Sequence, residues 1–500
     1  MTANLLVAPL IQTNGSALTL PGLFAAMARG EVTSFPALRP HQRPTWHMFL
    51  VQLGVLARSG QDGPLPEDEA TWRTNLRDLT SDFEDDAPWH LVGEDDSKPA
   101  FLQPPDPGGV KWSEVATPDA LDMLITSRNH DLKRDIAHDA SPEDWLFALV
   151  SLQTMEGFGG AGNYGIARMN GGSSSRAMIG LAPVRPGTAI VDPSAWWRRD
   201  VMRLTAKRDD LSGPALLWCL PWPEKQLLDL ATLDPMFIEV CRRIRLQEGQ
   251  RGLSAKRGTS KAARIAAKEA NGMTGDPWAP VHLAENKTLT LGDQNWSYKL
   301  INRLLYGGDW KVPDLATPTG DEDRMDMALV AEAFARGNSK TDGFKSRVIP
   351  VPKTAIKSML GPKPTEFSRE QVETIESVDR ALRDGLALIA AEGDYTKRGK
   401  AEYARSQPAR DQFARIADAA FFPALWEKLG HATEEARNAA HTRFTRQLAA
   451  AARAEFERAA PAIPCAAIMR PRAMTRGRVA FEVGIRKVFE ELGIKESEHV

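Results

Sequence analysis

The sequence predicts an α+β protein, with a large irregular α/β N-terminal domain over residues 1–363 and a C-terminal four-helix bundle over residues 364–500. Up to about Lys363, short apolar segments alternate with Pro and Gly, as at residues 103–109, which is typical of a mixed domain with long loops. From about Thr365 onward, Ala, Glu, Arg and Leu dominate with helical spacing and few prolines. A chain of 500 residues with 42% hydrophobic content suffices for two or three cored domains.

One helix of the N-terminal domain can be placed from its start signal. The run Ser141-Pro142-Glu143-Asp144 has the pattern of a capped helix start. Apolar residues at helical spacing then continue to about Met155. We expect this helix to lead the chain directly to Gly157.

The C-terminal part predicts four helices packed as a bundle, because its apolar residues recur at helical spacing. The expected spans are 367–392, 396–430, 432–459 and 473–492. They are separated by Gly393, by Gly430 and by a stretch from Pro461 to Pro471.

Composition narrows the classes of function. The formal net charge is only −2, so a nucleic-acid surface requires local segregation of Lys and Arg. The three cysteines are far apart and include no CxxC pair, which argues against a disulfide framework or a zinc ribbon and fits a reducing cytoplasm. The sequence has no apolar run of roughly 18 to 20 residues and no signal-peptide pattern, so we expect a cytoplasmic protein without a membrane partner. No motif calls for a cofactor.

A glycine-rich segment follows the helix expected before Gly157. It runs from Gly157 to Gly162 and is followed by Asn163 and by the arginines Arg168 and Arg176. Glycine has no Cβ, so its amides can approach a groove or a phosphate closely, and the arginines could supply counter-charge. The segment lacks the Lys-Ser/Thr ending of a P-loop. A flexible turn without a ligand is the alternative interpretation.

Basic residues are concentrated between Arg242 and Ala270. Nine cations face two acids there, which gives a local charge of +7 (9 − 2). Ser, Gly and Thr interrupt the run, which suggests a mobile basic loop able to neutralise phosphates and reach into a groove. A merely solvated loop is the alternative.

A polar segment with two glycines, residues 337–347, follows a helical pattern at Ala328–Ala335. It predicts an exposed, hairpin-like projection. Against DNA, side chains on such a tip can enter between paired bases and unstack them. On these residues alone, an ordinary surface loop is the favoured interpretation.

Residues 127–139 concentrate two His and three Asp, so a metal-dependent nuclease is a hypothesis that must be considered. Its candidate residues are His130, Asp131, His138 and Asp139. Their spacing matches no common metal motif. A loop that grips RNA and a solvated segment remain alternatives.

Taken in chain order, these features resemble the CasA-type large subunit of the type I-E CRISPR Cascade surveillance complex, over nearly the whole chain. The resemblance is carried by residues 4–6 (Asn-Leu-Leu), 101–103 (Phe-Leu-Gln), 157–160 (Gly-Phe-Gly-Gly), 275–280 (Gly-Asp-Pro-Trp-Ala-Pro), the loop at 337–343, and the terminal bundle. The glycine loop after a helix is the most specific of these features.

The resemblance implies roles for particular residues. A glycine loop and a lysine finger would read the protospacer-adjacent motif from the minor groove, and a wedge would split the next base pairs. The motif-reading loop would be Gly157, Phe158, Gly159, Gly160 and Asn163. The finger would be Lys268 or, second, Lys261, and the wedge would be Lys340, Thr341 and Asp342. Contact with guide RNA or a backbone subunit would fall to Asn129, His130 and Asp131.

The same resemblance implies a non-enzymatic role in antiviral defence. The chain would recognise the motif in double-stranded DNA, start R-loop formation and help recruit a helicase-nuclease or another associated nuclease. Its partners would be guide RNA (crRNA), double-stranded target DNA, and the backbone, 5′-handle-binding and small subunits of Cascade. Relatives often carry a glutamine at the wedge tip, whereas this chain offers Thr341-Asp342, so its strand-separating strength and motif preference stay open. A metal-dependent nuclease and a helical scaffold that binds only protein are the alternatives.

Overall fold

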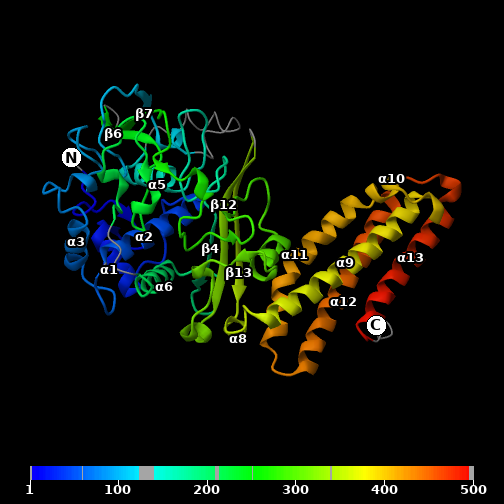
Figure 1. The fold of residues 1–500 in the computed structure, drawn as a ribbon. Helices are drawn as coiled ribbons and strands as arrows, with labels where there is room; N and C mark the ends of the chain where they lie inside the picture. The colour runs from blue at the N-terminus through cyan, green and yellow to red at the C-terminus, as the bar shows by residue number, and fades with distance from the viewer. Residues whose placement is uncertain are drawn as a thin grey trace. The chain divides into compact units, whose positions relative to one another are not determined.

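The computed structural model describes residues 3–58, 60–122, 140–208, 213–249, 252–337 and 340–494 (Figure 1). The chain forms two compact units. The first comprises Met1–Trp296, Asp309–Thr317 and Asp326–Ile349. The second comprises Ser297–Gly308, Pro318–Met325 and Pro350–Val500.

Helix α2 (Arg43–Ala57) lies at the centre of the first unit. Every residue of α2 after Arg43 is buried, as expected for a helix that is apolar on all sides. It packs against α5 (Pro142–Thr154) and α6 (Pro193–Thr205). Helix α1 (Leu20–Arg29) packs against α6 and against α3 (Glu69–Asp78). This helical layer provides the rigid support behind the loops described below.

The longest sheet of the first unit is antiparallel between β4 (Met178–Pro183) and β12 (Met327–Gly337), with Leu329 opposite Leu181. Its strand order is β13-β12-β4, with β13 spanning Lys340–Val351. The helix expected at Ala328–Ala335 is therefore wrong. These residues form a central strand buried on both faces, and such a strand has a continuous apolar run that periodicity cannot distinguish from a buried helix.

A second three-stranded sheet has the order β3-β7-β6. Strand β3 spans Ser113–Val115, and β6 (Arg243–Gly249) pairs antiparallel with β7 (Gly252–Gly258). The shorter strands are β1 (Ile11–Gln12), β2 (Ala17–Leu18), β5 (Leu228–Asp229), β8 (Ile265–Ala266), β9 (Val281–His282), β10 (Lys287–Thr288) and β11 (Trp310–Lys311). Several small separate sheets beside a helical layer confirm the predicted α+β class.

The second unit contains the helical bundle. Its long helices are α9 (Pro362–Ala390), α11 (Gln407–Gly430), α12 (Glu434–Ala459) and α13 (Arg470–Glu491). Helix α9 packs against the other three, and α12 meets α13 through the stacked rings of Phe456 and Phe481, 4.7 Å apart. The shorter helices are α7 (Tyr298–Tyr306), α8 (Lys353–Ile356) and α10 (Lys400–Ala404). Three of the four predicted helices are thus present with shifted ends, whereas the predicted helix 396–430 is divided into α10 and α11.

Among the described residues, no helix is both long enough and apolar enough to span a membrane.

Candidate nucleic-acid interface

The glycine-rich loop begins directly after α5, as the sequence predicted. Ser141 caps this helix: its hydroxyl accepts from the amide of Asp144, and the Asp144 carboxylate accepts from the amide of Ser141. The helix ends at Thr154, and the chain then enters the loop. A capped, buried helix therefore fixes where the loop starts.

Backbone hydrogen bonds turn the loop back on itself. The amides of Gly157 and Phe158 donate to the carbonyls of Ser174 and Gly172, at 3.0 and 2.8 Å. Nearer the tip, the amide of Gly159 donates to the carbonyl of Asn163 at 2.8 Å. The tip is consequently a tight turn rather than a freely moving segment.

The loop's residues differ in exposure. Gly157 is buried, and a Cβ placed on it would collide with the Ser174 carbonyl oxygen, so packing alone requires glycine there. Phe158 is 41% exposed, and Gly159 is also exposed. Gly160 has φ +112°, and a Cβ added to it would have no atom within 4 Å, so it combines a glycine backbone with open space. The surface that a ligand can reach therefore includes Phe158 to Ala161.

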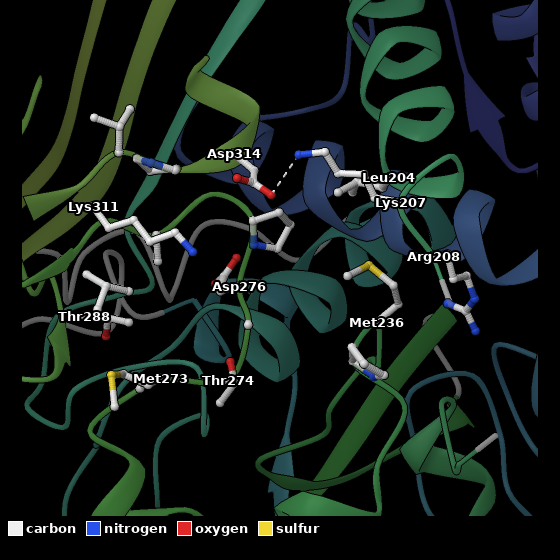
Figure 2. A pocket seen from close by; sticks show the side chains of 18 residues that line it. Leu204, Lys207, Arg208, Met236, Met273, Thr274, Asp276, Thr288, Lys311 and Asp314 are labelled. Atoms are coloured by element: carbon white, nitrogen blue, oxygen red, sulfur yellow. Dashed lines mark hydrogen bonds and ion pairs between the residues drawn. The ribbon is translucent and has the colours of Figure 1, made fainter. Parts of the chain in front are cut away.

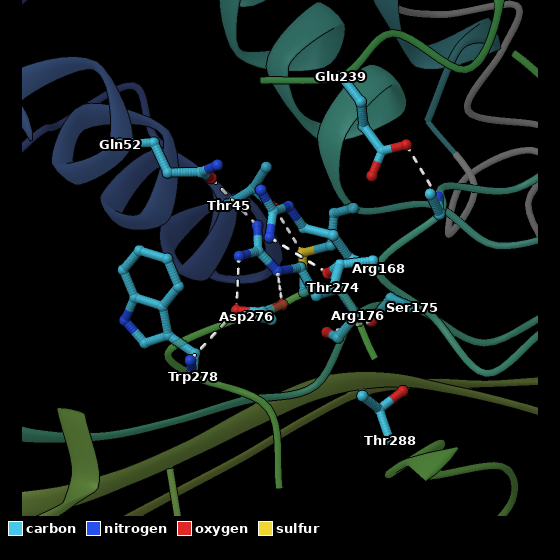
Figure 3. Close-up of polar contacts among 12 residues, drawn as sticks. Thr45, Gln52, Arg168, Ser175, Arg176, Glu239, Thr274, Asp276, Trp278 and Thr288 are labelled. Atoms are coloured by element: carbon cyan, nitrogen blue, oxygen red, sulfur yellow. Dashed lines mark hydrogen bonds and ion pairs between the residues drawn. The ribbon is translucent and has the colours of Figure 1, made fainter. Parts of the chain in front are cut away.

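The two arginines expected to supply counter-charge are buried, so that expectation is wrong (Figure 3). Arg176 makes a two-pronged ion pair with Asp276, at 2.5 and 2.8 Å. Arg168 donates to the carbonyls of Pro235 and Phe237, at 3.0 and 2.9 Å. Burial lowers the pKa of Arg168 to about 10. Both guanidinium groups anchor the glycine-rich segment from inside.

Asp276 belongs to the Gly275–Pro280 motif and explains part of it. Burial alone would raise the pKa of its carboxyl, but the Arg176 guanidinium outweighs burial and holds the pKa below its usual value. The same carboxylate accepts from the amide of Trp278 at 3.1 Å. Through Asp276, the motif therefore holds Arg176, at the C-terminal end of the glycine-rich segment, in place.

The basic run is not one loop, because its first part forms the hairpin of β6 and β7 and its later part contains the short strand β8 and a 3₁₀ turn at Lys268–Ala270. Four of its arginines are buried: Arg242, Arg243, Arg245 and Arg264. Arg242 donates to the Gly157 carbonyl at 2.7 Å, and Arg243 donates to the Trp222 carbonyl at 2.7 Å. A count of charges along the sequence cannot show that these guanidinium groups donate hydrogen bonds to carbonyl groups of distant segments.

Two buried glutamines hold the hairpin against the loop, and the sequence analysis did not single out Gln153. The side-chain oxygen of Gln153 accepts from the amides of Cys241 and Arg242, and its amide nitrogen donates to the Leu102 carbonyl. Gln103, in one of the motifs that carry the resemblance, accepts from the amide of Leu246 at 2.6 Å. These contacts position β6 directly behind the glycine loop.

Both finger candidates lie beside the loop. Lys261 is 69% exposed, with Nζ 4.0 Å from a Glu224 carboxylate oxygen, and Lys268 is exposed at the start of a short 3₁₀ turn. Together with Gly157 and Phe158, they line a hollow of about 670 Å³, which we call the lysine hollow. The structure thus brings together two sequence segments that the prediction placed in one site.

A buried carboxyl also lines the lysine hollow. Glu239 accepts from the amide of Ala167 at 2.8 Å, and its other oxygen has no hydrogen-bond partner among the described residues. Burial raises the pKa of this carboxyl, although the Ala167 amide and the nearby Arg168 act in the opposite direction.

A second hollow, of about 470 Å³, shares the same loop. Gly159 and Asn163 line it, together with Lys111 and Arg257, so we call it the Lys111 hollow. The sequence offered no sign of Lys111, which precedes the short strand β3 and lies far from the glycine loop along the chain.

The other predicted contacts are only partly described. Lys340, Thr341 and Asp342 are the first residues of β13, directly after the connection from β12. Strands β12 and β13 are neighbours in one sheet, and the projection and its wedge role stay predictions. The guide-RNA candidates Asn129, His130 and Asp131 lie outside the described residues.

The nuclease hypothesis is not tested, because His130, Asp131, His138 and Asp139 all lie in the undescribed segment 123–139. Within the described ranges, no group of three or more His, Cys, Asp or Glu residues is placed to hold a metal ion.

Another pocket of the first unit, of about 500 Å³, lies beside Met236 and Met273 (Figure 2). Its charged groups largely satisfy one another: Lys207 lies 3.2 Å from Asp314, and Arg208 lies 2.5 Å from Asp234. This pocket therefore presents less available charge to a polyanion than the two hollows at the loop.

Comparison with known proteins identifies the fold. No protein-family model matches the sequence, and no curated protein matches it. The crystal structure of the CRISPR-associated protein Cse1 from Acidimicrobium ferrooxidans matches with a TM-score of 0.66 at 15% identity, covering 98% of this chain and 99% of that one. The chain has the CasA (Cse1) fold.

Two further solved structures match over nearly the whole chain. CasA (Cse1) of Thermus thermophilus matches with a TM-score of 0.64 at 16% identity, over 97% of this chain and 99% of that one. A chain of a structure named CRISPR RNA-guided surveillance complex matches with a TM-score of 0.51 at 13% identity, over 98% and 99% of the two chains. The resemblance inferred from the order of motifs is thereby confirmed for the fold.

Proposed function

We propose that this chain is the large subunit of a type I-E-like Cascade complex, which recognises the protospacer-adjacent motif in double-stranded DNA and starts R-loop formation. The observation that carries the proposal is the meeting of the glycine-rich loop, through Gly157 and the exposed Phe158, with two exposed lysines at one hollow. The CasA fold of the chain, over nearly its full length, supports the same role.

The loop has the chemistry that minor-groove reading requires. The minor groove is narrow and shows a degenerate pattern of donors and acceptors, so a backbone turn with one nearby cation suits loose recognition of several related motifs. Gly159 and Gly160 place no side chain at the tip, and Lys261 or Lys268 supplies the positive charge. Arg168 and Arg176 contribute by holding the segment in place from within.

Under this proposal, the hairpin of β12 and β13 opens the duplex. Lys340, Thr341 and Asp342 stand at the start of β13, where a wedge could separate the first base pairs. Pairing with the guide RNA then supplies target specificity. The RNA-DNA heteroduplex that forms is about as stable as the DNA duplex that it replaces, so protein contacts can favour its formation. The chain needs no catalytic group for this role.

The proposed partners are guide RNA, target DNA, the other Cascade subunits and an associated nuclease. One matching chain belongs to a structure named an RNA-guided surveillance complex, which supports assembly with RNA and further subunits. Asn129, His130 and Asp131 remain the candidates for contact with the guide or a backbone subunit.

The test is to assemble the complex with guide RNA and measure its binding to a library of DNA targets with randomised flanking motifs. Gly160→Asp should abolish motif-dependent binding, because it adds a carboxylate at the tip and strains a turn with φ +112°. Gly63→Asp is the matched control, since Gly63 has φ +94° and equally open surroundings. Lys268→Ala should weaken the preference for particular flanking motifs without disturbing the fold.

Retained motif selection in Gly160→Asp, with the complex assembled, would contradict the proposal. Cleavage of plasmid DNA by the purified chain with magnesium or manganese, lost in His138→Ala, would instead favour the nuclease. Duplex binding that is unchanged when Lys261 and Lys268 are both made Ala would favour a scaffold or another DNA surface.

A further inference from the structure

The Lys111 hollow lies against the same loop as the lysine hollow. Gly157, Phe158 and Tyr164 line the lysine hollow, whereas Gly159 and Asn163 line the Lys111 hollow. Residues of one short turn thus divide between two neighbouring hollows.

The chain after β7 reinforces this division. The amide of Ser260 donates to the Gly162 carbonyl at 3.0 Å, and the Tyr164 hydroxyl donates to the Lys261 carbonyl at 3.2 Å. Thr259 lines the Lys111 hollow, while Lys261 lines the lysine hollow. The glycine loop and residues 259–261 are therefore joined by hydrogen bonds and together contribute to both hollows, and we call this joined segment the ridge.

The Lys111 hollow presents two cations. Lys111 and Arg257 are both exposed, and neither has an ion-pair partner within the part of the chain that the structure describes. Both are held near the hollow by the sheet: Arg257 pairs with Ser113 in register, and Val110 packs so closely on Gly258 that a Cβ there would collide with its Cγ1. Their positions are therefore set by strands rather than by free chain.

The charge of the Lys111 hollow suits a polyanion. Its lining contains Lys111, Arg242 and Arg257 against the single acid Glu156, which gives a charge of +2 (3 − 1). The guanidinium of Arg242 is buried and already donates to the Gly157 carbonyl, so Lys111 and Arg257 are the cations available to a ligand. The exposed residue Thr259 adds a hydroxyl that could donate to a phosphate oxygen.

We propose that the ridge lies between the two strands of the duplex, with Lys111 and Arg257 contacting backbone phosphates of one strand and Lys261 those of the other, while Lys268 remains the groove-reading finger of the proposed function. This inference rests on the proposed minor-groove reading and adds to it a phosphate-contacting surface and an assignment of strands. A loop inside the minor groove, which is about 6 Å wide, has one sugar-phosphate backbone on each side. Cations in both flanking hollows then fix the register of the loop on the duplex, without reading sequence.

The first measurement is the salt dependence of duplex binding by the guide-loaded complex. Each lost phosphate contact reduces the slope of log K against log salt by about 0.9 in magnitude, so Lys111→Ala/Arg257→Ala should reduce it by about 1.8. The loss should be the same for all flanking motifs, with their ranking unchanged. Lys111→Arg/Arg257→Lys should retain the slope, and Lys311→Ala, an exposed lysine of the Met236 pocket, should leave it as in the wild type.

The second measurement assigns the strands. Neutral methylphosphonates are placed in the DNA backbone beside the motif, first on one strand and then on the other. Substitution on one strand should remove the difference in duplex affinity between wild type and Lys111→Ala/Arg257→Ala. Substitution on the opposite strand should remove the difference in duplex affinity between wild type and Lys261→Ala.

Three results would overturn the inference. An unchanged salt slope in Lys111→Ala/Arg257→Ala would show that these cations contact no phosphate. A response of Lys111→Ala/Arg257→Ala and of Lys261→Ala to the same strand would show that the ridge does not lie between the strands. Loss of guide RNA from the complex in Lys111→Ala/Arg257→Ala would assign this hollow to RNA instead of DNA. If one of these results occurs while the wild-type complex still prefers particular flanking motifs, only the inference fails. If the wild-type complex shows no preference among flanking motifs, the proposed function fails as well.

Discussion

The ion pair between Arg176 and Asp276 should be among the costliest contacts of the first unit to break. Both side chains are 1% exposed, and two hydrogen bonds of 2.5 and 2.8 Å join them. Asp276→Asn removes the negative charge and leaves the Arg176 guanidinium buried without its counter-ion. Breaking a buried pair from one side costs about 3 to 5 kcal/mol, so the unfolding free energy of the unit should fall by that amount.

A double-mutant cycle separates the pair from its surroundings. Arg176→Met keeps much of the side-chain volume and leaves the Asp276 carboxylate unpaired, so it should cost a similar amount. The double variant should lose clearly less than the sum of the two single losses, because no unpaired buried charge remains. Urea unfolding followed by tryptophan fluorescence is a suitable assay, since Trp278 lies beside the pair, with the Arg176 guanidinium 5.1 Å from its ring. A loss below about 1 kcal/mol for Asp276→Asn, or strictly additive losses, would refute this reasoning.

Three further predictions concern stability. Burial raises the pKa of Glu332 to about 7, so the stability that its neutral form contributes is present below pH 4.5 and is lost as pH rises through 7. The unfolding free energy of Glu332→Gln should therefore rise relative to that of the wild type by about 3 kcal/mol between pH 5 and 8, as measured by urea titration. Burial lowers the pKa of His441 to about 4, helped by a nearby lysine, so stability should fall as pH drops from 6.5 toward 4, and His441→Gln should flatten that fall. Gly477→Ala would drive a Cβ into the Ile389 side chain and should cost about 1 to 3 kcal/mol, whereas the exposed Val479→Ala should change the melting temperature little. Equal pH profiles for each titrating variant and the wild type, or a Gly477→Ala protein as stable as the wild type, would count against these three assignments.

The elements that sequence could predict are those whose signals are local. The capping pattern at Ser141 and the helical spacing after Thr365 depend only on neighbours along the chain, and both led to helices that the structure contains. The strand β12 was mistaken for a helix because its burial on both faces is a property of the sheet, not of the segment.

The candidate site shows the same limit. The glycine loop and the lysines Lys261 and Lys268 could be found from composition and order, and they do line one hollow. The burial of Arg168 and Arg176 could not be found, because their partners Phe237 and Asp276 come from distant segments. Lys111 was missed for the related reason that only the sheet brings it to the loop.

Physical contact between the loop tip and the motif can be measured by cross-linking. Phe158 is an exposed aromatic residue at the tip, so a photoreactive benzoylphenylalanine can replace it with little change in shape. In the guide-loaded complex on target duplex, irradiation should join this position to nucleotides of the flanking motif, and the yield should fall when the motif is scrambled. Cross-links found only to protein subunits, or to DNA away from the motif, would contradict the placement of this loop in the minor groove.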